Sequence, residues 1–95
     1  MAILLHVLYT VKEGQRDAFY TLLNELEIPQ KSREEEDNIR YDYSFPTDSS
    51  NHLFLLEIWK SKEGLEIHKK MPHFLKLQDI KEDYIEGVKL DIYEI

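Results

Sequence analysis

The chain has 95 residues, of which 42% are hydrophobic and 12% aromatic, and its 12 basic and 19 acidic side chains give a formal net charge of −7 at pH 7. This length and composition are those of a single globular domain over residues 1–95, and they exclude a disordered or fibrous chain. The acidic charge argues against nucleic acid or an anionic membrane as a partner, and the lack of cysteine excludes a disulfide framework. We expect a cytoplasmic domain that handles a small molecule or another protein.

The first predicted element is a strand over Ala2–Val11, which is rich in Ile, Leu, Val and Tyr. Its apolar part ends at Tyr9 and is interrupted by His6. It is far shorter than the roughly 20 residues that a membrane-spanning helix needs. No basic residue precedes Ile3, so the segment does not resemble a signal peptide.

A helix is predicted from Gln15 onwards, where apolar residues follow a helical period: Ala18, Phe19, Leu22, Leu23 and Leu26. Pro29 stops or kinks this helix. Ser32 and Glu35 have the spacing of a capping box, which predicts that a further helical turn begins at Ser32. The acidic run 34–37 predicts the end of that turn, because clustered negative charges disfavour a helix C-terminus.

A β-hairpin is predicted next. Residues 39–45 alternate between apolar and polar side chains, which places on one face Ile39, Tyr41, Tyr43 and Phe45. The segment 46–51 has turn composition, and His52–Trp59 returns as a strongly apolar strand.

Two helices and a last strand complete the chain. Ser61 is a good N-cap for a short helix that carries Leu65, Ile67 and His68. Pro72 suits the first position of another helix, which continues through Ile80. Gly87 is expected to break the pattern before a strand over 88–93.

The order βαββαβ predicts an α+β fold, the ferredoxin-like plait, in which helices cover one face of a four-stranded antiparallel sheet. The strand His52–Trp59 is apolar on both faces, although helices can cover only one. We therefore expect a second copy of the chain to cover the other face, forming a homodimer.

Sequence motifs for metals and cofactors are missing. His68 and His73 are five positions apart rather than at i, i+4, and there is no H-E-x-x-H. The chain also lacks a G-x-G-x-x-G motif, a P-loop and a nucleophile elbow. We therefore expect no metal and no cofactor.

His68 is the main candidate for chemistry. Leu65, three positions earlier, shares its helix face, so the imidazole points at or near the sheet. It is either a core-edge histidine bonded to backbone or a general base in a pocket between helix and sheet. His73 suits a helix cap or the surface, and His6 suits a place on the first strand or in a dimer interface.

The aromatic side chains allow two interpretations. Trp59, Tyr41 and Tyr43 can pack in the core, or they can line a cavity that binds an aromatic compound and offer their polar atoms to it.

A family resemblance extends over nearly the whole chain. The stretch Glu57–Phe74 has E-x-W at the end of a strand, a histidine nine positions after the tryptophan, and then Pro72-His73-Phe74. It resembles the signature of the antibiotic biosynthesis monooxygenase family. Upstream, Glu35 to Tyr41 resembles that family's E-x-G-[CN]-x-x-[YF], with Asp37 in place of the usual glycine.

The resemblance implies a dimeric α+β barrel with a small-molecule cavity between sheet and helices. Members include cofactor-independent monooxygenases of quinols and polyketide aromatics, haem-degrading proteins, and enzymes of phosphorylated autoinducer-2. The Asn–Trp–His set of the haem-degrading members has no counterpart here, which disfavours that function. For a quinol monooxygenase that uses dioxygen, the implied catalytic base is His68, and the implied substrate-binding residues are Tyr41, Tyr43, Trp59, His73 and Phe74.

Two alternatives remain open. One is an isomerase of a small phosphorylated sugar, in which His68 and His73 move protons and Lys69 or Lys70 helps to bind the anion. The other is a dimer that binds a small molecule without turnover, because one fold supports many functions.

Overall fold

The computed structural model describes all 95 residues. The elements in chain order are β1 (Ile3–Val11), α1 (Arg16–Glu25), α2 (Ile28–Arg33), β2 (Asn38–Ser44), β3 (His52–Trp59), α3 (Lys62–His68), α4 (Pro72–Tyr84) and β4 (Ile85–Glu94). No helix has both the length and the apolar character needed to cross a membrane.

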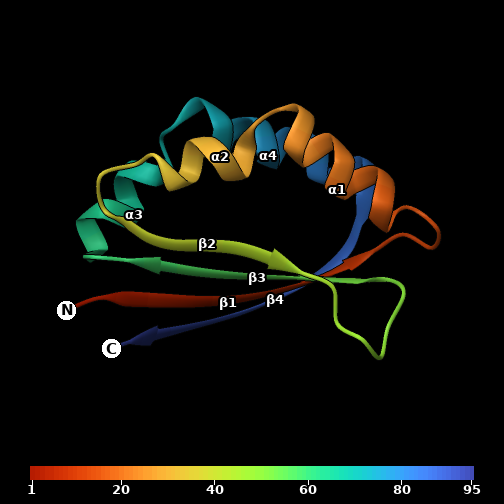
Figure 1. Cartoon of the computed structure of the whole chain (residues 1–95), viewed down its shortest axis with the longest axis horizontal. Helices are drawn as coiled ribbons and strands as arrows, with labels where there is room; N and C mark the ends of the chain where they lie inside the picture. Colours follow the sequence, from red (N-terminus) through yellow and green to blue (C-terminus); the bar gives the residue numbers. More distant parts are fainter.

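The four strands form one antiparallel sheet in the order β2-β3-β1-β4. All helices lie on the same face of this sheet, and both chain termini lie at one end of it (Figure 1). This confirms the predicted α+β, ferredoxin-like fold, in which each of the two helical crossovers is divided into two helices.

The core lies between the sheet and the helices. Every second residue of β1 is buried there because successive side chains of a strand point to opposite faces. Leu53, Leu55 and Trp59 of β3 continue this layer, and α1 and α4 close it with Phe19, Leu23 and Leu77.

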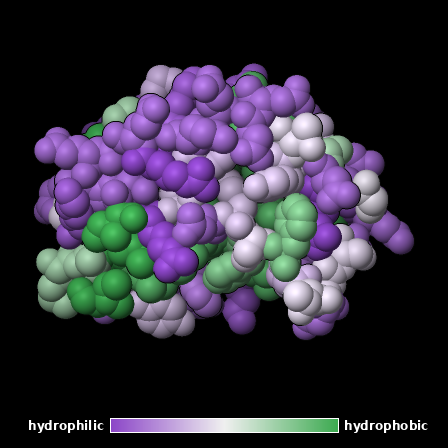
Figure 2. Space-filling model, viewed as in Figure 1, coloured by the Kyte–Doolittle hydropathy of each residue, from purple (hydrophilic) through white to green (hydrophobic).

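The other face of the sheet carries no helix, yet it is rich in apolar side chains. Leu4 and Leu8 of β1 lie beside residues of β3, with Leu4 opposite Ile58 and Leu8 opposite Phe54. Figure 2 shows hydrophobic side chains gathered at the level of the strands, beneath a mostly hydrophilic layer of helices. We call the helix-free face of the sheet the outer sheet face. His6 lies on it, exposed, with its ring 4.6 Å from that of Phe54.

The predicted restart of the helix at Ser32 is wrong, because α2 already begins at Ile28. Glu27 adopts the left-handed conformation (φ 58°) and turns the chain, and Pro29 sits in the first turn of α2, where its missing N–H costs no helical hydrogen bond. Ser32 lies inside α2 and donates its hydroxyl to the Ile28 carbonyl at 2.8 Å.

Two strand details also differ from the prediction. The register of β2 shifts between Asn38 and Arg40, which leaves Ile39 54% exposed instead of on the core face, and Phe45 lies beyond the strand end. Gly87 does not precede the last strand but lies within β4, paired with Thr10. An edge strand tolerates glycine because its backbone still forms the ladder.

The predicted caps of the second crossover are confirmed. The Ser61 hydroxyl accepts a hydrogen bond from the Gly64 N–H at 3.1 Å, and Pro72 occupies the first turn of α4. These residues fix where α3 and α4 begin, on either side of His68 in the chain.

Candidate active site between the sheet and helices α3 and α4

A cavity of about 160 Å³ lies between the sheet and the second helical crossover. Nine of its 14 lining residues are hydrophobic, so most of its wall is apolar. The lining residues are Leu5, Val7, Tyr9, Tyr41, Glu57, Leu65, His68, Lys69, Phe74, Leu77, Gln78, Lys81, Val88 and Leu90.

Glu57 places a carboxyl group in this apolar wall. On β3 it lies between Leu55 and Trp59, which share its face of the strand, so its side chain points at the helices and is 9% exposed. The indole Nε1 of Trp59 donates to Glu57 Oε1 at 3.0 Å and orients the carboxyl group. Burial raises the pKa of Glu57 to about 7, although the Trp59 hydrogen bond and the charge of Lys81 act in the opposite direction.

His68 is the last residue of α3, and its side chain is 3% exposed. Its Nδ1 atom lies 2.5 Å from Glu35 Oε2, and its ring lies 4.5 Å from the ring of Trp59. Burial lowers the pKa of His68, while the hydrogen bond and charge of Glu35 act to raise it. Burial therefore favours the neutral form of His68, and the Glu35 carboxylate favours its charged form.

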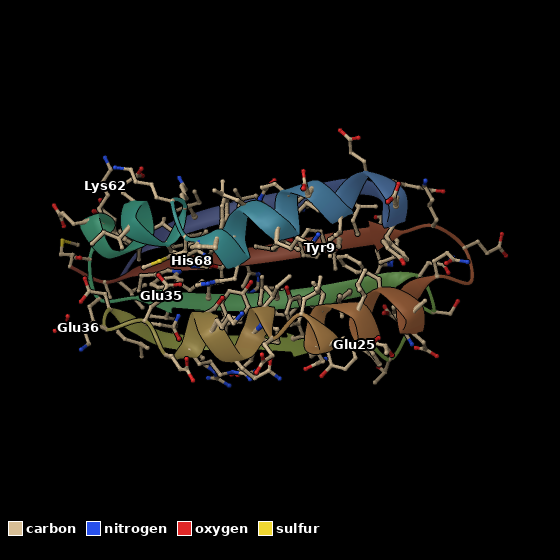
Figure 3. The ribbon with its side chains drawn as sticks, turned by 90° about the horizontal axis from the view of Figure 1, so that it is seen from above. Tyr9, Glu25, Glu35, Glu36, Lys62 and His68 are labelled. Atoms are coloured by element: carbon tan, nitrogen blue, oxygen red, sulfur yellow. The ribbon has the colours of Figure 1, made fainter.

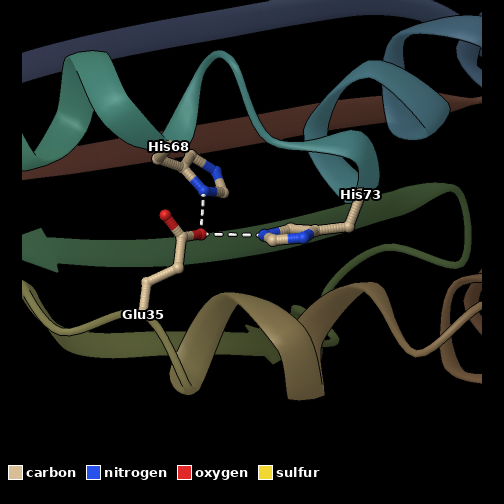
Figure 4. Close-up of side chains that lie close together, drawn as sticks. All are labelled: Glu35, His68 and His73. Carbon is tan, nitrogen blue, oxygen red and sulfur yellow. Dashed lines mark hydrogen bonds and ion pairs between the residues drawn. The ribbon is translucent and has the colours of Figure 1, made fainter.

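Glu35 joins two histidines. It lies on the segment between α2 and β2, with its side chain directed towards α3 (Figure 3). Its Oε2 atom is hydrogen-bonded to both His68 and His73 (Figure 4). The His73 Nε2 atom is 2.8 Å away, and Glu35 Oε1 is buried without a hydrogen-bond partner.

The ligand atoms of Glu35, His68 and His73 lie within 4.8 Å of one another, so these residues could also hold a divalent cation. Such an ion would replace the two hydrogen bonds to Oε2.

The two ring nitrogens of His68 face different groups. With Nδ1 donating to the Glu35 carboxylate, the free lone pair is on Nε2, and this atom lies 4.0 Å from Glu57 Oε1. Both Glu57 and His68 line the cavity. A ligand hydroxyl there can give its proton to His68, and Glu35 then stabilises the imidazolium.

The tyrosines of the cavity serve as neutral donors and acceptors. Burial raises the pKa of both Tyr9 and Tyr41 well above the usual value, so their hydroxyl groups stay protonated. The hydroxyl groups of Tyr41 and Tyr43 lie 3.4 Å apart.

The structure brings some of the residues singled out from the sequence to the cavity and leaves others away from it. Tyr41, His68 and Phe74 line the cavity. Trp59 lies behind His68 and lines a neighbouring, acidic pocket of about 210 Å³, and His73 reaches His68 only through Glu35. Tyr43 lies in a shallow surface depression with Tyr20 and Phe45.

Sequence reasoning gave no role in the site to Glu35, Glu57, Tyr9 or Lys81. The sequence could have indicated that Glu57 is buried among apolar side chains, because it is the one charged residue in the strand His52–Trp59 and shares a face with Leu55 and Trp59. Glu35 is the glutamate of the stretch that resembles the family's E-x-G-[CN]-x-x-[YF], but its contact with His68 had no sequence signal, because only the fold brings the acidic run 34–37 to α3.

Several solved structures share this fold. A Pseudomonas aeruginosa protein, PA3566, is 26% identical with a TM-score of 0.89 over 99% of this chain and 93% of its own. A Bacteroides thetaiotaomicron protein described as a possible oxidoreductase is 28% identical, with a TM-score of 0.87 over 99% and 97%. A Methanosarcina mazei protein is 23% identical with a TM-score of 0.88 over 99% and 92%, a likeness of fold alone.

No protein of curated function matches the chain. The family model described as antibiotic biosynthesis monooxygenase matches residues 2–80, which include both crossovers up to α4 and every residue of the Glu35–His68–His73 cluster. The chain therefore belongs to the antibiotic biosynthesis monooxygenase family.

Proposed function

We propose that the protein is a cofactor-independent monooxygenase of a small quinol or polyphenolic compound. The observation that carries this proposal is the arrangement of His68, whose Nδ1 atom is held by Glu35 while its Nε2 atom lies beside Glu57 at an apolar cavity. Such an arrangement supplies a positioned base beside a mostly apolar wall.

The proposed reaction needs no reductant other than the substrate. His68 accepts a hydroxyl proton of the quinol, and the resulting quinolate is electron-rich enough to reduce dioxygen. A ring carbon forms a bond to dioxygen, and the resulting peroxide takes up one proton to give a hydroperoxide. The O–O bond then breaks, the proton on that carbon leaves, and water is released. Quinol and O₂ thus become hydroxyquinone and H₂O, and the substrate supplies every electron.

Dioxygen consumption tests this proposal. Chelator-treated protein is assayed with hydroquinones and reduced naphthoquinones, beside a blank without protein, because quinols autoxidise. We expect uptake above the blank that falls at least about 100-fold in His68→Ala, the order of magnitude for loss of a general base. His52→Ala is the matched control, because His52 bonds to Ser49 in the β2–β3 turn rather than to the cavity. Uptake equal to the blank with every quinol would contradict the proposal.

A second candidate is supported by the two lysines at the cavity, Lys69 and Lys81. Cations beside a histidine suit an isomerase of a small phosphorylated sugar, although the mostly apolar wall favours the first candidate. Millimolar sugar phosphates would raise the melting temperature if this were correct, since a ligand at 100 Kd adds roughly 2.7 kcal/mol of stability. A rise in melting temperature without turnover of any substrate would instead support a binding protein without catalysis.

We further propose that the protein acts as a cytoplasmic homodimer, with the outer sheet face as the interface. The support is the row of half-buried apolar side chains on that face, formed by Leu4, Leu8, Phe54, Leu56 and Ile58. Each such side chain contributes roughly 1.5–3 kcal/mol when it is fully buried.

A further inference from the structure

Two side chains of the cavity, the acidic Glu57 and the basic Lys81, do not contact each other directly. Glu57 is held by Trp59 at 3.0 Å. Lys81 forms no ion pair: its Nζ atom lies 5.2 Å from the centre of the Tyr9 ring and donates at 3.5 Å to Gln78 Oε1. Both residues line the cavity, so each is available to a ligand.

Lys81 faces the cavity because of its position on α4. It follows buried Leu77 by four positions, so the two share the face of the helix that packs on the sheet. Lys69, the other lysine at the cavity, is paired with Glu66 at 3.5 Å and is more exposed. Lys81 is therefore the cation of the cavity that forms no direct ion pair, and a half-buried cation without one favours a bound anion.

The acidic end of the cavity suits a hydroxyl group. Glu57 Oε1 and His68 Nε2 are 4.0 Å apart, too far for a direct hydrogen bond. A hydroxyl oxygen between them can lie about 2.8 Å from both atoms, as hydrogen bonds require. This is also where the proposed reaction needs the substrate hydroxyl.

The size of the cavity suits a single ring. Its volume is about 160 Å³, close to that of an apolar cavity of about 150 Å³ that binds benzene. A fused two-ring compound would have to extend beyond it, towards the exposed side chains of Val88 and Leu90.

We propose that Glu57 and Lys81 select a single-ring dihydroxy aromatic acid, with a ring hydroxyl between Glu57 and His68 and the carboxylate at Lys81. This inference rests on the proposed function and names its substrate class. Glu57 and Lys81 are the specificity-determining residues, and His68 remains the base.

Anaerobic calorimetry tests the selection without turnover. The probes are 2,5-dihydroxybenzoate and its nearly isosteric neutral amide, 2,5-dihydroxybenzamide. Wild-type protein is expected to bind the acid roughly tenfold or more tightly than the amide, the range for a hydrogen bond to a charged group. Lys81→Gln should remove this preference by weakening the acid alone, and Lys81→Arg should keep part of it.

Two further variants guard against misfolding and non-specific charge effects. Lys76→Gln removes an exposed lysine of the same helix and should leave the preference unchanged. Glu57→Gln keeps an oxygen for the Trp59 hydrogen bond and should weaken the amide at least as much as the acid, because it also removes a negative charge that would repel the ligand carboxylate. Thermal unfolding of each variant verifies that it is folded.

The two proposals fail in different ways. Equal binding of acid and amide by the wild type, or a preference retained in Lys81→Gln, would overturn the selection whatever the oxygen assay shows. Preferential binding of the acid without quinol-dependent oxygen uptake would leave the selection standing and contradict the monooxygenase.

Discussion

His68 and Glu35 are 33 positions apart in the chain, and their side chains meet at 2.5 Å between His68 Nδ1 and Glu35 Oε2. Their side chains are 3% and 8% exposed, so bulk water does not compete for this bond. A buried carboxylate at one ring nitrogen sets the tautomer of the imidazole and raises its affinity for a proton at the other nitrogen. In the proposed reaction, Glu35 is therefore the positioning residue for His68.

Glu35→Gln should change the pH dependence of oxygen consumption. The Glu35 hydrogen bond and charge raise the pKa of His68 against the larger effect of burial, so their loss lowers this pKa further. The acid limb of the profile of kcat/KM against pH should move to lower pH, and kcat should fall about tenfold or more. Glu36→Gln, at an exposed neighbour, should change neither. A purely structural role for Glu35 would reduce the rate without moving the limb.

Glu57→Gln should change how stability depends on pH. Because burial raises the pKa of Glu57 to about 7, the folded chain retains a proton that the unfolded chain releases near pH 4.5. The stability that Glu57 contributes is full below the unfolded pKa and is lost as the pH rises to the folded pKa.

The variant cannot ionise at this position. As the pH rises from about 5 to about 8, its free energy of unfolding should therefore increase relative to that of the wild type, by on the order of 1–3 kcal/mol. Urea unfolding at both pH values and a fixed protein concentration measures the difference. Parallel pH dependences of the two proteins would show that Glu57 is ionised throughout this range.

Gly64→Ala should destabilise the protein because Asp37 occupies the space of the missing side chain. A Cβ atom on Gly64 would lie 2.5 Å from the Asp37 Cβ atom and 2.6 Å from its Oδ2 atom. We expect a loss of about 1–3 kcal/mol, typical of overpacking. Asp37 stands where the resemblance places a glycine, so Asp37→Gly should recover much of this loss in the double variant. Simple addition of the two single effects would argue against the steric link.

Leu56→Glu should disrupt the proposed homodimer. Leu56 lies on the outer sheet face, opposite His6 of β1 and Asp42 of β2, so a carboxylate there would place a charge at the centre of the interface. Sedimentation at micromolar concentration should give two chain masses for wild type and one for the variant. A single chain mass for wild type would refute the dimer.

Chelation of divalent cations should leave quinol-dependent oxygen consumption unchanged, because the proposed reaction gives no step to a metal. The assay compares EDTA-treated and untreated protein with the same quinol. Loss of activity on chelation, with recovery on adding one metal, would instead assign the Glu35–His68–His73 cluster to that metal.

The order of strands and helices was predictable from the sequence because it depends on local periodicity. Alternation in β1 and β3, the helical stripe of α1 and the caps at Ser61 and Pro72 each involve residues a few positions apart. The errors arose where one local rule overrode another: the left-handed turn at Glu27 allowed Pro29 to begin α2, and backbone pairing carried β4 through Gly87.

The sequence also identified His68, Tyr41 and Phe74, which share the cavity. A histidine on the apolar face of a short helix and a tyrosine in an alternating strand are local patterns, and the family resemblance supplied Phe74. The tertiary structure alone decided their partners. Glu35 meets His68 only after α2 and α3 pack on the same sheet face, and Lys81 reaches the cavity only because α4 lies across β1. Distances between segments depend on how the layers pack, and local periodicity carries no information about them.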